Sequence, residues 1–375
     1  MTKEQELLLD ILKNALFDAP LSLAPETDFA PILKEAKEQT VLPLVAAALQ
    51  TKNTTGYQSL VHYIQVVHEQ SMLIKLFEEN SVPLVILKGT AAAMYYPKPH
   101  LRTMGDVDFI VPVEKFEEAR KILEENRYVF RQDFGDDRDY EYTKGGVILE
   151  LHRRFSNHPG VEQRIKNGIE HAVLCSVNGY EFPCLPPTEN GLAILDHIRH
   201  HFKSSGLGLR HLLDWMMFAH TVLDDKVWAE QFQPIAKETG LERLAVVLTA
   251  TCRKWLGLPE DYGWSRHVED DLADQTIETF LTNGNFGRKL VREDHKVEDA
   301  TIAVKREGLF RFLQSTGELT WTALEKHPWL RPFAWLYQSC RYISRGVKAL
   351  SRGENFRKQV AHGKVKGDFY NRLGI

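Results

Sequence analysis

Apolar residues near the start of the chain recur at the three- and four-residue spacing of amphipathic helices. Leu8, Ile11 and Leu12 form one such group, and Tyr63, Ile64 and Val67 form another. The spacing predicts a helical N-terminal region over residues 1–80. No residue pattern in this region suggests chemistry of its own.

The pattern changes to short strands at residue 81. Residues 84–87 are continuously apolar between Pro83 and Gly89, which is typical of a buried strand. Helices are expected after it at residues 90–96 and 114–126, and further strands at 107–111, 128–132, 140–143 and 147–153. The last two strands are joined by a tight turn at 145–146. This alternation predicts a unit with a mixed sheet over residues 81–186.

Helical periodicity returns after Pro187. Thr188 suits a helix N-cap and Glu189 the first turn. The helical pattern predicts a domain over residues 187–350, followed by a basic C-terminal tail at 351–375. The predicted fold class is therefore α+β: a mixed β-sheet core flanked by a helical N-terminal segment and a helical C-terminal domain.

Composition and charge narrow the function classes. The net charge of −4 gives no whole-protein case for binding nucleic acid or an anionic membrane. None of the four cysteines lies in a C-x-x-C pair, and reduced thiols are expected; a hairpin at 177–179 that brings Cys175 opposite Cys184 is the alternative that the spacing leaves open. The polar N-terminus and the absence of a long uncharged apolar run predict a soluble cytoplasmic protein without a transmembrane segment.

Two carboxylates, Asp106 and Asp108, begin the second predicted strand after Gly105. Side chains two residues apart on a strand point to the same face, so these carboxylates repel each other unless a cation lies between them. Their oxygen atoms suit Mg²⁺ or Mn²⁺. An Asp-x-Asp pair alone is also common at a solvated strand end, so the pair needs support from elsewhere in the sequence.

A third carboxylate, Glu150, shares one face of a later strand with Ile148 and His152. If this strand pairs beside the strand of Asp106 and Asp108, the three carboxylates converge. Three such groups form the ligand set of a two-metal phosphoryl-transfer site.

A candidate phosphate cradle precedes the carboxylates. Lys88 ends a predicted strand, Gly89 permits close approach of the backbone, and Thr90 opens a helix whose first amides are free donors. Arg102, between this helix and the carboxylates, is a further candidate phosphate contact. Taken singly, Lys88 also suits a strand-end lysine, Thr90 an N-cap and Arg102 a surface loop. The P-loop pattern is absent.

Together these pieces resemble the nucleotidyltransferase family of the polymerase-beta superfamily, and most closely a bacterial family of largely undefined substrate. The resemblance rests on Leu-Lys-Gly-Thr at 87–90, Tyr-Pro at 96–97, Gly-Asp-Val-Asp at 105–108 and Leu-Glu-Leu-His at 149–152. It spans roughly residues 30–340 and implies transfer of a nucleoside monophosphate from a nucleoside triphosphate to an acceptor, with Mg²⁺ as cofactor and release of pyrophosphate.

The resemblance also implies residue roles. Asp106 and Asp108 would be metal ligands, Glu150 the third carboxylate, and Gly89 and Thr90 contacts of the triphosphate. This chain has Thr90 and Glu150 where Ser and Asp are more usual, and both exchanges keep the functional group. The longer reach of Glu150 leaves two roles open, metal ligand or general base.

The helical half contributes a histidine-rich segment. His197 and His201 stand four residues apart, a spacing that can bind a transition metal, and Arg210 and Asp214 can pair on the next helix. Similar segments in the family imply a helical wall over the nucleotide, with His201 and Arg210 as contacts. The alternative is a set of structural histidines near an interdomain cleft.

Two further functions compete with nucleotidyl transfer. One is a non-catalytic nucleotide-binding or antitoxin-like regulatory protein on the same scaffold. The other is a phosphohydrolase built around the histidines at 197, 200 and 201. The acceptor, whether a small molecule, a sugar or a protein, is not named by any residue pattern.

Overall fold

The computed structural model describes residues 1–50, 54–133, 138–203, 206–284, 304, 308–321, 324, 327–351 and 356–375. The chain divides into two compact units, Met1–Leu290 and Val291–Ile375, and each is described by itself. The boundary lies within the segment 187–350 that was predicted to be one helical domain.

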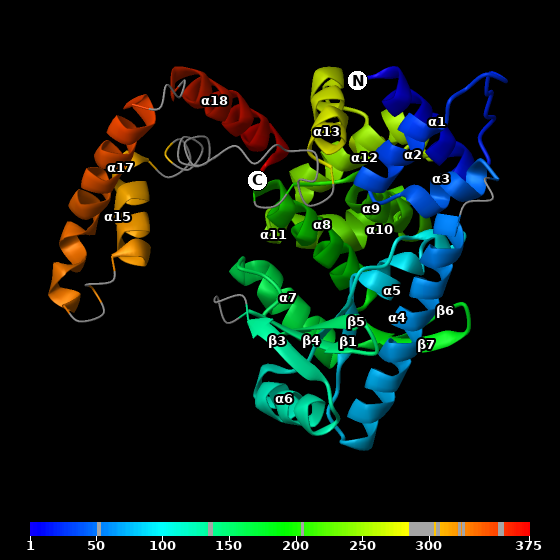
Figure 1. Ribbon diagram of the computed structural model, residues 1–375, viewed down its shortest axis with the longest axis horizontal. Coiled ribbons are helices and arrows are strands. Elements are labelled where there is room, and N and C mark those ends of the chain that lie inside the picture. Colours follow the sequence, from blue (N-terminus) through cyan, green and yellow to red (C-terminus); the bar gives the residue numbers. More distant parts are fainter. Residues whose placement is uncertain are drawn as a thin grey trace. The chain divides into compact units, whose positions relative to one another are not determined.

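The N-terminal segment is helical, as its periodicity predicts. Its helices are α1 (Lys3–Phe17), α2 (Ala30–Glu38), α3 (Leu42–Ala48) and α4 (Thr54–Glu79). Thr2 caps α1 through a reciprocal pair of hydrogen bonds with Gln5. The long helix α4 runs alongside the sheet (Figure 1).

A seven-stranded mixed sheet forms the centre of the first unit, so the predicted α+β class is confirmed. The strands are β1 (Val85–Leu87), β2 (Val107–Ile110), β3 (Val129–Asp133), β4 (Asp139–Lys144), β5 (Val147–His152), β6 (Val173–Val177) and β7 (Tyr180–Cys184). Their order is β3-β4-β5-β2-β1-β7-β6. Strand β2 pairs in parallel with β5 and β1 in parallel with β7, whereas the other neighbours are antiparallel.

The two faces of the sheet differ in chemistry because successive side chains alternate. Val107 and Phe109 of β2, with Leu149 and Leu151 of β5, lie in a buried apolar cluster. Residues of α4 and of α6 (Phe116–Glu125) complete this cluster, for example Phe77, which contacts Phe109 edge-on. The intervening residues of β2 and β5 point to the other face, and they include the polar residues Asp108, Glu150 and His152.

Short helices connect the strands. Helix α5 (Gly89–Ala93) follows β1, and the single turns η1 (Pro99–Leu101) and η2 (Val113–Lys115) precede β2 and α6. Helix α5 is shorter than the expected 90–96 segment. The predicted hairpin around 177–179 is present as β6 and β7, in the register Cys175↔Phe182.

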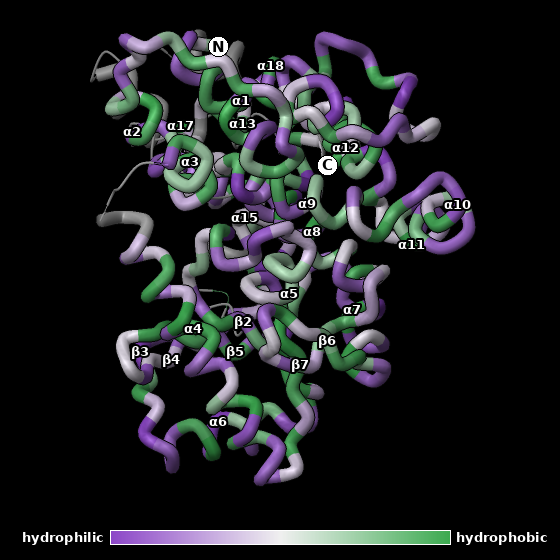
Figure 2. Tube along the Cα trace, turned by 90° about the vertical axis from the view of Figure 1, so that its right-hand side faces the viewer, coloured by the Kyte–Doolittle hydropathy of each residue, from purple (hydrophilic) through white to green (hydrophobic). Residues whose placement is uncertain are grey.

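The rest of the first unit is helical. It contains α7 (Pro159–Glu170), α8 (Pro187–Lys203), α9 (Leu209–Val222), α10 (Asp225–Val227), η3 (Trp228–Phe232), α11 (Gln233–Glu238), α12 (Glu242–Leu256), η4 (Gly263–Ser265) and α13 (Asp270–Asn283). Helix α9 is buried along most of its length, and its Trp215 Nε1 donates to Thr249 Oγ1 of α12 at 2.9 Å. Figure 2 shows hydrophobic and hydrophilic positions alternating along the helices.

The second unit contains α15 (Leu309–Thr320), η6 (Pro328–Phe333), α17 (Ala334–Ser351) and α18 (Phe356–Leu373). The aromatic stretch at 329–342 packs partly against α15 and the residue after it, since Tyr337 stacks on Trp321 at 4.8 Å. Most of the segment predicted to be a basic tail is helix α18. Among the described residues, no helix has both the length and the apolar character needed to cross a membrane.

Gly191 gives a direct test of how closely the helical layers pack. A Cβ atom added there would overlap the Phe218 ring of α9 and lie 2.6 Å from Phe232 Cε2. We expect Gly191→Ala to lower the free energy of unfolding by about 1–3 kcal/mol through overpacking, measured by urea denaturation. The control is Gly160→Ala in α7, whose added Cβ meets no atom closer than 3.5 Å. Equal stability of both variants and the parent would contradict the packing.

Candidate active site

Three predicted carboxylates converge on the polar face of the sheet. Asp108 of β2 lies directly opposite Glu150 of the parallel strand β5. Asp106 lies one residue before β2 and lines the same pocket. The pairing of β2 with β5, on which the predicted convergence depended, is thus present. Ligand atoms of Asp108, Glu150 and His152 all lie within 4.8 Å of one another.

Lys88 supplies the positive charge nearest to Asp108. Its Nζ lies 2.7 Å from Asp108 Oδ1 and 3.9 Å from Glu150 Oε2. The Lys88 backbone has a φ of 48°, a conformation that is strained for a residue with a side chain. Burial lowers the pKa of Lys88, but Asp108, Glu150 and Asp106 together raise it above its ordinary value. Lys88 therefore stays charged and sits where the carboxylates need a cation.

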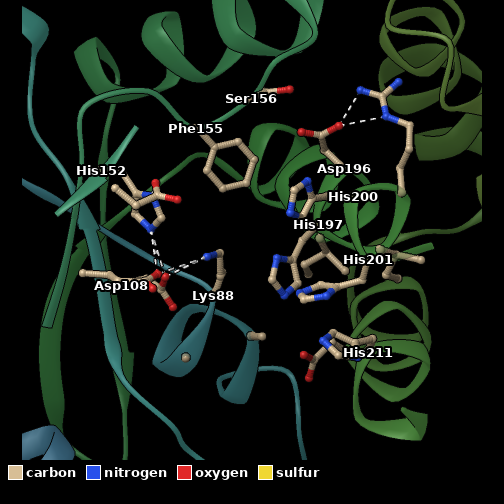
Figure 3. Close-up of a pocket in the computed structure, with 18 of the residues that line it drawn as sticks. Lys88, Asp108, His152, Phe155, Ser156, Asp196, His197, His200, His201 and His211 are labelled. Carbon is tan, nitrogen blue, oxygen red and sulfur yellow. Dashed lines mark hydrogen bonds and ion pairs between the residues drawn. The ribbon is translucent and has the colours of Figure 1, made fainter. Parts of the chain in front are cut away.

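His152 is the second counter-charge. Its Nε2 lies 2.9 Å from Asp108 Oδ1 (Figure 3), and its Nδ1 lies 2.5 Å from Asp139 Oδ1. Burial and Lys88 lower the pKa of His152, but the hydrogen bonds to Asp108 and Asp139 outweigh them and raise it to about 9. At neutral pH the ring is an imidazolium held between two carboxylates, which fixes its orientation.

The charges of Lys88 and His152 do not fully compensate the carboxylates Glu150 and Asp106. Burial and the neighbouring Asp108 raise the pKa of Glu150 to about 8, and the same two causes raise the pKa of Asp106. For Asp108, by contrast, burial is outweighed by Lys88 and His152, so its pKa is held well below the usual range. Asp106 and Glu150 are thus the two carboxylates whose ionised forms still lack compensation, and an added cation would supply it.

The two predicted phosphate contacts at the start of α5, Gly89 and Thr90, do not both line the pocket. Gly89 lines the pocket at the start of α5, but this helix has only five residues, so its dipole contributes little. Thr90 is fully buried, and its hydroxyl donates to Gln70 Oε1 of α4 at 2.6 Å. The Thr90 hydroxyl therefore ties α5 to α4 and is not part of the pocket lining.

Arg102 joins the α/β core to the helical half. Its Nε and Nη2 each lie 2.7 Å from a different carboxylate oxygen of Asp214 on α9, and Tyr96 Oη donates to the same carboxylate at 2.9 Å. Asp214 thus pairs with Arg102, and Arg210, the other partner the sequence allowed, instead donates from Nη1 to the Thr103 carbonyl at 3.3 Å. All three groups of the Arg102 cluster are buried.

A pocket of about 790 Å³ separates the carboxylates from α8 and α9. Its far wall carries His197, His200, His201, Arg210 and His211 (Figure 3). The predicted helical wall is therefore present, with His201 and Arg210 in it. The pocket is large enough for a nucleotide-sized ligand.

Sequence reasoning missed four residues of the site. His152 was placed on the face of Glu150 by strand alternation, but it received no role. Asp139, Arg138 and His211 carry no local signal, because strand pairing and helix packing bring them to the pocket from distant positions.

The mixed sheet, the paired carboxylates on its polar face and the Lys-Gly strand end agree with the nucleotidyltransferase resemblance in the sequence. The match of residues 25–257 to a family model supports this class, and the chain belongs to the family described as "Uncharacterised nucleotidyltransferase". A comparison with curated proteins found no match.

Solved structures with some similarity are distant. One is ANT(2″)-Ia in complex with adenylyl-2″-tobramycin, at 15% identity and a TM-score of 0.33, covering 46% of this chain and 94% of that one. Another is an antigenic nucleotidyltransferase-like protein from Paracoccidioides brasiliensis, at 14% identity and a TM-score of 0.34, covering 54% and 97%.

The Arg102–Asp214 pair allows a double-substitution test. Arg102→Met leaves the Asp214 charge buried without its partner, so we expect the free energy of unfolding to fall by about 3–5 kcal/mol. Arg102→Met/Asp214→Leu removes both charges and should recover most of that loss. Denaturant titration of the parent, both single variants and the double variant measures the coupling. Additive losses would show that the pair does not act as a unit.

Proposed function

We propose that this protein is a metal-dependent nucleotidyltransferase that transfers a nucleoside monophosphate from a nucleoside triphosphate to an acceptor, with release of pyrophosphate. The observation that carries the proposal is the convergence of Asp106, Asp108 and Glu150 on one pocket, in a chain that belongs to a nucleotidyltransferase family. Membership supports nucleotidyl transfer in general, whereas the metal, the donor and the site residues are our assignments.

The donor atoms suit the proposed cation. Asp106, Asp108 and Glu150 offer hard carboxylate oxygens, which Mg²⁺ and Mn²⁺ prefer. Burial and the neighbouring Asp108 raise the pKa values of Asp106 and Glu150, and the positive charges of Lys88 and, for Glu150, of His152 offset this only in part. Bound Mg²⁺ or Mn²⁺ would supply the balance and would polarise phosphate oxygens.

Side chains of the pocket would take separate roles in binding the cation and the triphosphate. Asp106, Asp108 and Glu150 would hold the cation, and His152, fixed by Asp139, would orient the Asp108 carboxylate. Lys88, which lies beside Asp108, would neutralise a phosphate oxygen next to the Gly89 backbone. Arg210, from the opposite wall, would contact the same triphosphate. Thr90 would support this edge of the site through Gln70.

The acceptor would enter between the carboxylates and the histidine wall. Glu150 has the longest side chain of the three proposed carboxylates, so it would reach furthest toward an acceptor hydroxyl. This supports the general-base role for Glu150 alongside its contact with the cation. The acceptor class is a small molecule, a sugar or a protein with a hydroxyl group.

The test is pyrophosphate release from each nucleoside triphosphate with Mg²⁺ and a panel of hydroxyl-bearing acceptors. We expect Asp106→Asn and Asp108→Asn each to lower the rate on the order of 100-fold or more, because each removes a charge that acts on the reacting phosphates. Asp106 is only partly buried, so its variant is the safer one for folding. Glu114→Gln, an exposed residue of η2, is the control.

Two outcomes would contradict the proposal. A folded Asp108→Asn protein as active as the parent would show that the carboxylates are not the site. Tight nucleotide binding without pyrophosphate release for any acceptor would favour the non-catalytic regulatory protein on the same scaffold.

A further inference from the structure

Three histidines of the pocket wall form a cluster separate from the carboxylates. His197 and His201 face each other across one turn of α8, with ring centroids 4.4 Å apart. His211 of α9 lies against both, with ring centroids 5.2 Å from His197 and 4.8 Å from His201. Figure 3 shows the three rings gathered on the helical side, opposite Asp108.

One nitrogen of each ring lies within 4.8 Å of the other two. Burial lowers the pKa of all three histidines, with further lowering by neighbouring cations and by one another, and His201 reaches about 3. The rings are therefore neutral at physiological pH. Neutral imidazole is the form that binds a metal ion, whereas an imidazolium cannot.

His211 adds an independent observation. The ring is 2% exposed, and its Nε2 is buried without a hydrogen-bond partner among the described residues. Its Nδ1 accepts a long hydrogen bond, 3.4 Å, from the Gly208 amide. A buried ring nitrogen without a partner is uncommon, because leaving it unpaired costs stability. A ligand that contacts Nε2 would remove this cost.

We propose that His197, His201 and His211 bind one divalent transition-metal ion of the zinc class. Imidazole nitrogen suits Zn²⁺, whereas the carboxylate oxygens across the pocket suit Mg²⁺ or Mn²⁺, so the two sites select different ions. Zinc–nitrogen bonds of roughly 2.0–2.1 Å require the three nitrogens to approach one another on binding. Because neutral His211 accepts from Gly208 at Nδ1, its proton is on Nε2, and metal binding through Nε2 would move that proton to Nδ1 and give up the long Gly208 hydrogen bond.

Three protein ligands leave the fourth tetrahedral position open, as in zinc sites that bind a water molecule or a substrate. His197, His201 and His211 all line the pocket, so a ligand in the pocket would be able to reach an ion that they hold. Arg210 lies near the cluster, and its positive charge would repel a metal ion. The negative charges of Asp214 and Asp106 act against this repulsion, and Arg210 Nη1 donates a hydrogen bond to the Thr103 carbonyl. A zinc ion at this cluster would bind an oxygen or nitrogen atom of a water molecule or substrate, on the side of the pocket opposite the carboxylates. This assignment gives His201 a metal-binding role in place of a direct contact with nucleotide.

The test is metal binding by the full-length protein after chelator treatment, without nucleotide or Mg²⁺. Once the chelator is removed, we expect one added Zn²⁺ to bind per chain, and added Co²⁺ to give the intense visible absorption of a four-coordinate ion. His211→Ala and His197→Ala should each weaken Zn²⁺ binding by about 100-fold or more, since even loss of a group that only supports a ligand costs about 10–100-fold. His197 is less buried than His211, so its variant is informative even if His211→Ala fails to fold.

Two controls separate this site from others. His171→Ala removes an exposed histidine after α7 and should leave binding unchanged. Asp106→Asn/Asp108→Asn should also keep the cobalt spectrum, which makes the result independent of the proposed transferase activity. Absence of four-coordinate cobalt in the parent would overturn the proposal, as would a spectrum that survives in folded His197→Ala or is lost in the aspartate variant.

Discussion

The arrangement of the pocket depends on the charge balance among the carboxylates on the polar face of the sheet. The register of β2 and β5 sets Asp108 against Glu150 at the spacing of adjacent strands, roughly 4.8 Å, with Asp106 close by. Carboxylates this close and this buried cannot all ionise without nearby cations. Lys88 reaches them through a strained backbone conformation, and His152 is held protonated by Asp139. The fold thus maintains a site whose negative charge is only partly compensated.

A second constraint holds the opposite wall in place. Arg102 follows the α5 segment of the core, and Asp214 belongs to α9, yet the two form a buried bidentate pair that also engages Tyr96. Because a buried charge without its partner is costly, this pair fixes α9 relative to the sheet. The position of α9 in turn sets where Arg210 and His211 face the pocket.

Local patterning predicted much of the fold. The switch from helical periodicity to short apolar runs near residue 81 located the sheet, and alternation along β5 placed Glu150 and His152 on one face. The parallel pairing of β2 with β5, and the insertion of β7 beside β1, depend on contacts between distant segments, which periodicity does not encode.

The predicted phosphate contacts illustrate the same limit at the level of single residues. Arg102 and Thr90 are residue types that bind phosphate, but each finds a buried partner far along the chain, Asp214 and Gln70. Lys88, in contrast, was expected near phosphate and lies in the pocket, although its ammonium contacts Asp108. The grouping of His211 with His197 and His201 requires the packing of α9 on α8, so sequence spacing indicated only the two histidines of α8.

The most direct test of the central claim is isothermal titration of the purified protein with each nucleoside triphosphate, with and without Mg²⁺, repeated on Asp106→Asn/Asp108→Asn. The account predicts Mg²⁺-dependent binding of at least one nucleotide and its loss in the variant, with the variant's thermal unfolding showing that it remains folded. Nucleotide binding of equal strength in parent and variant would contradict the assignment of the carboxylates as the site that holds the metal and the triphosphate.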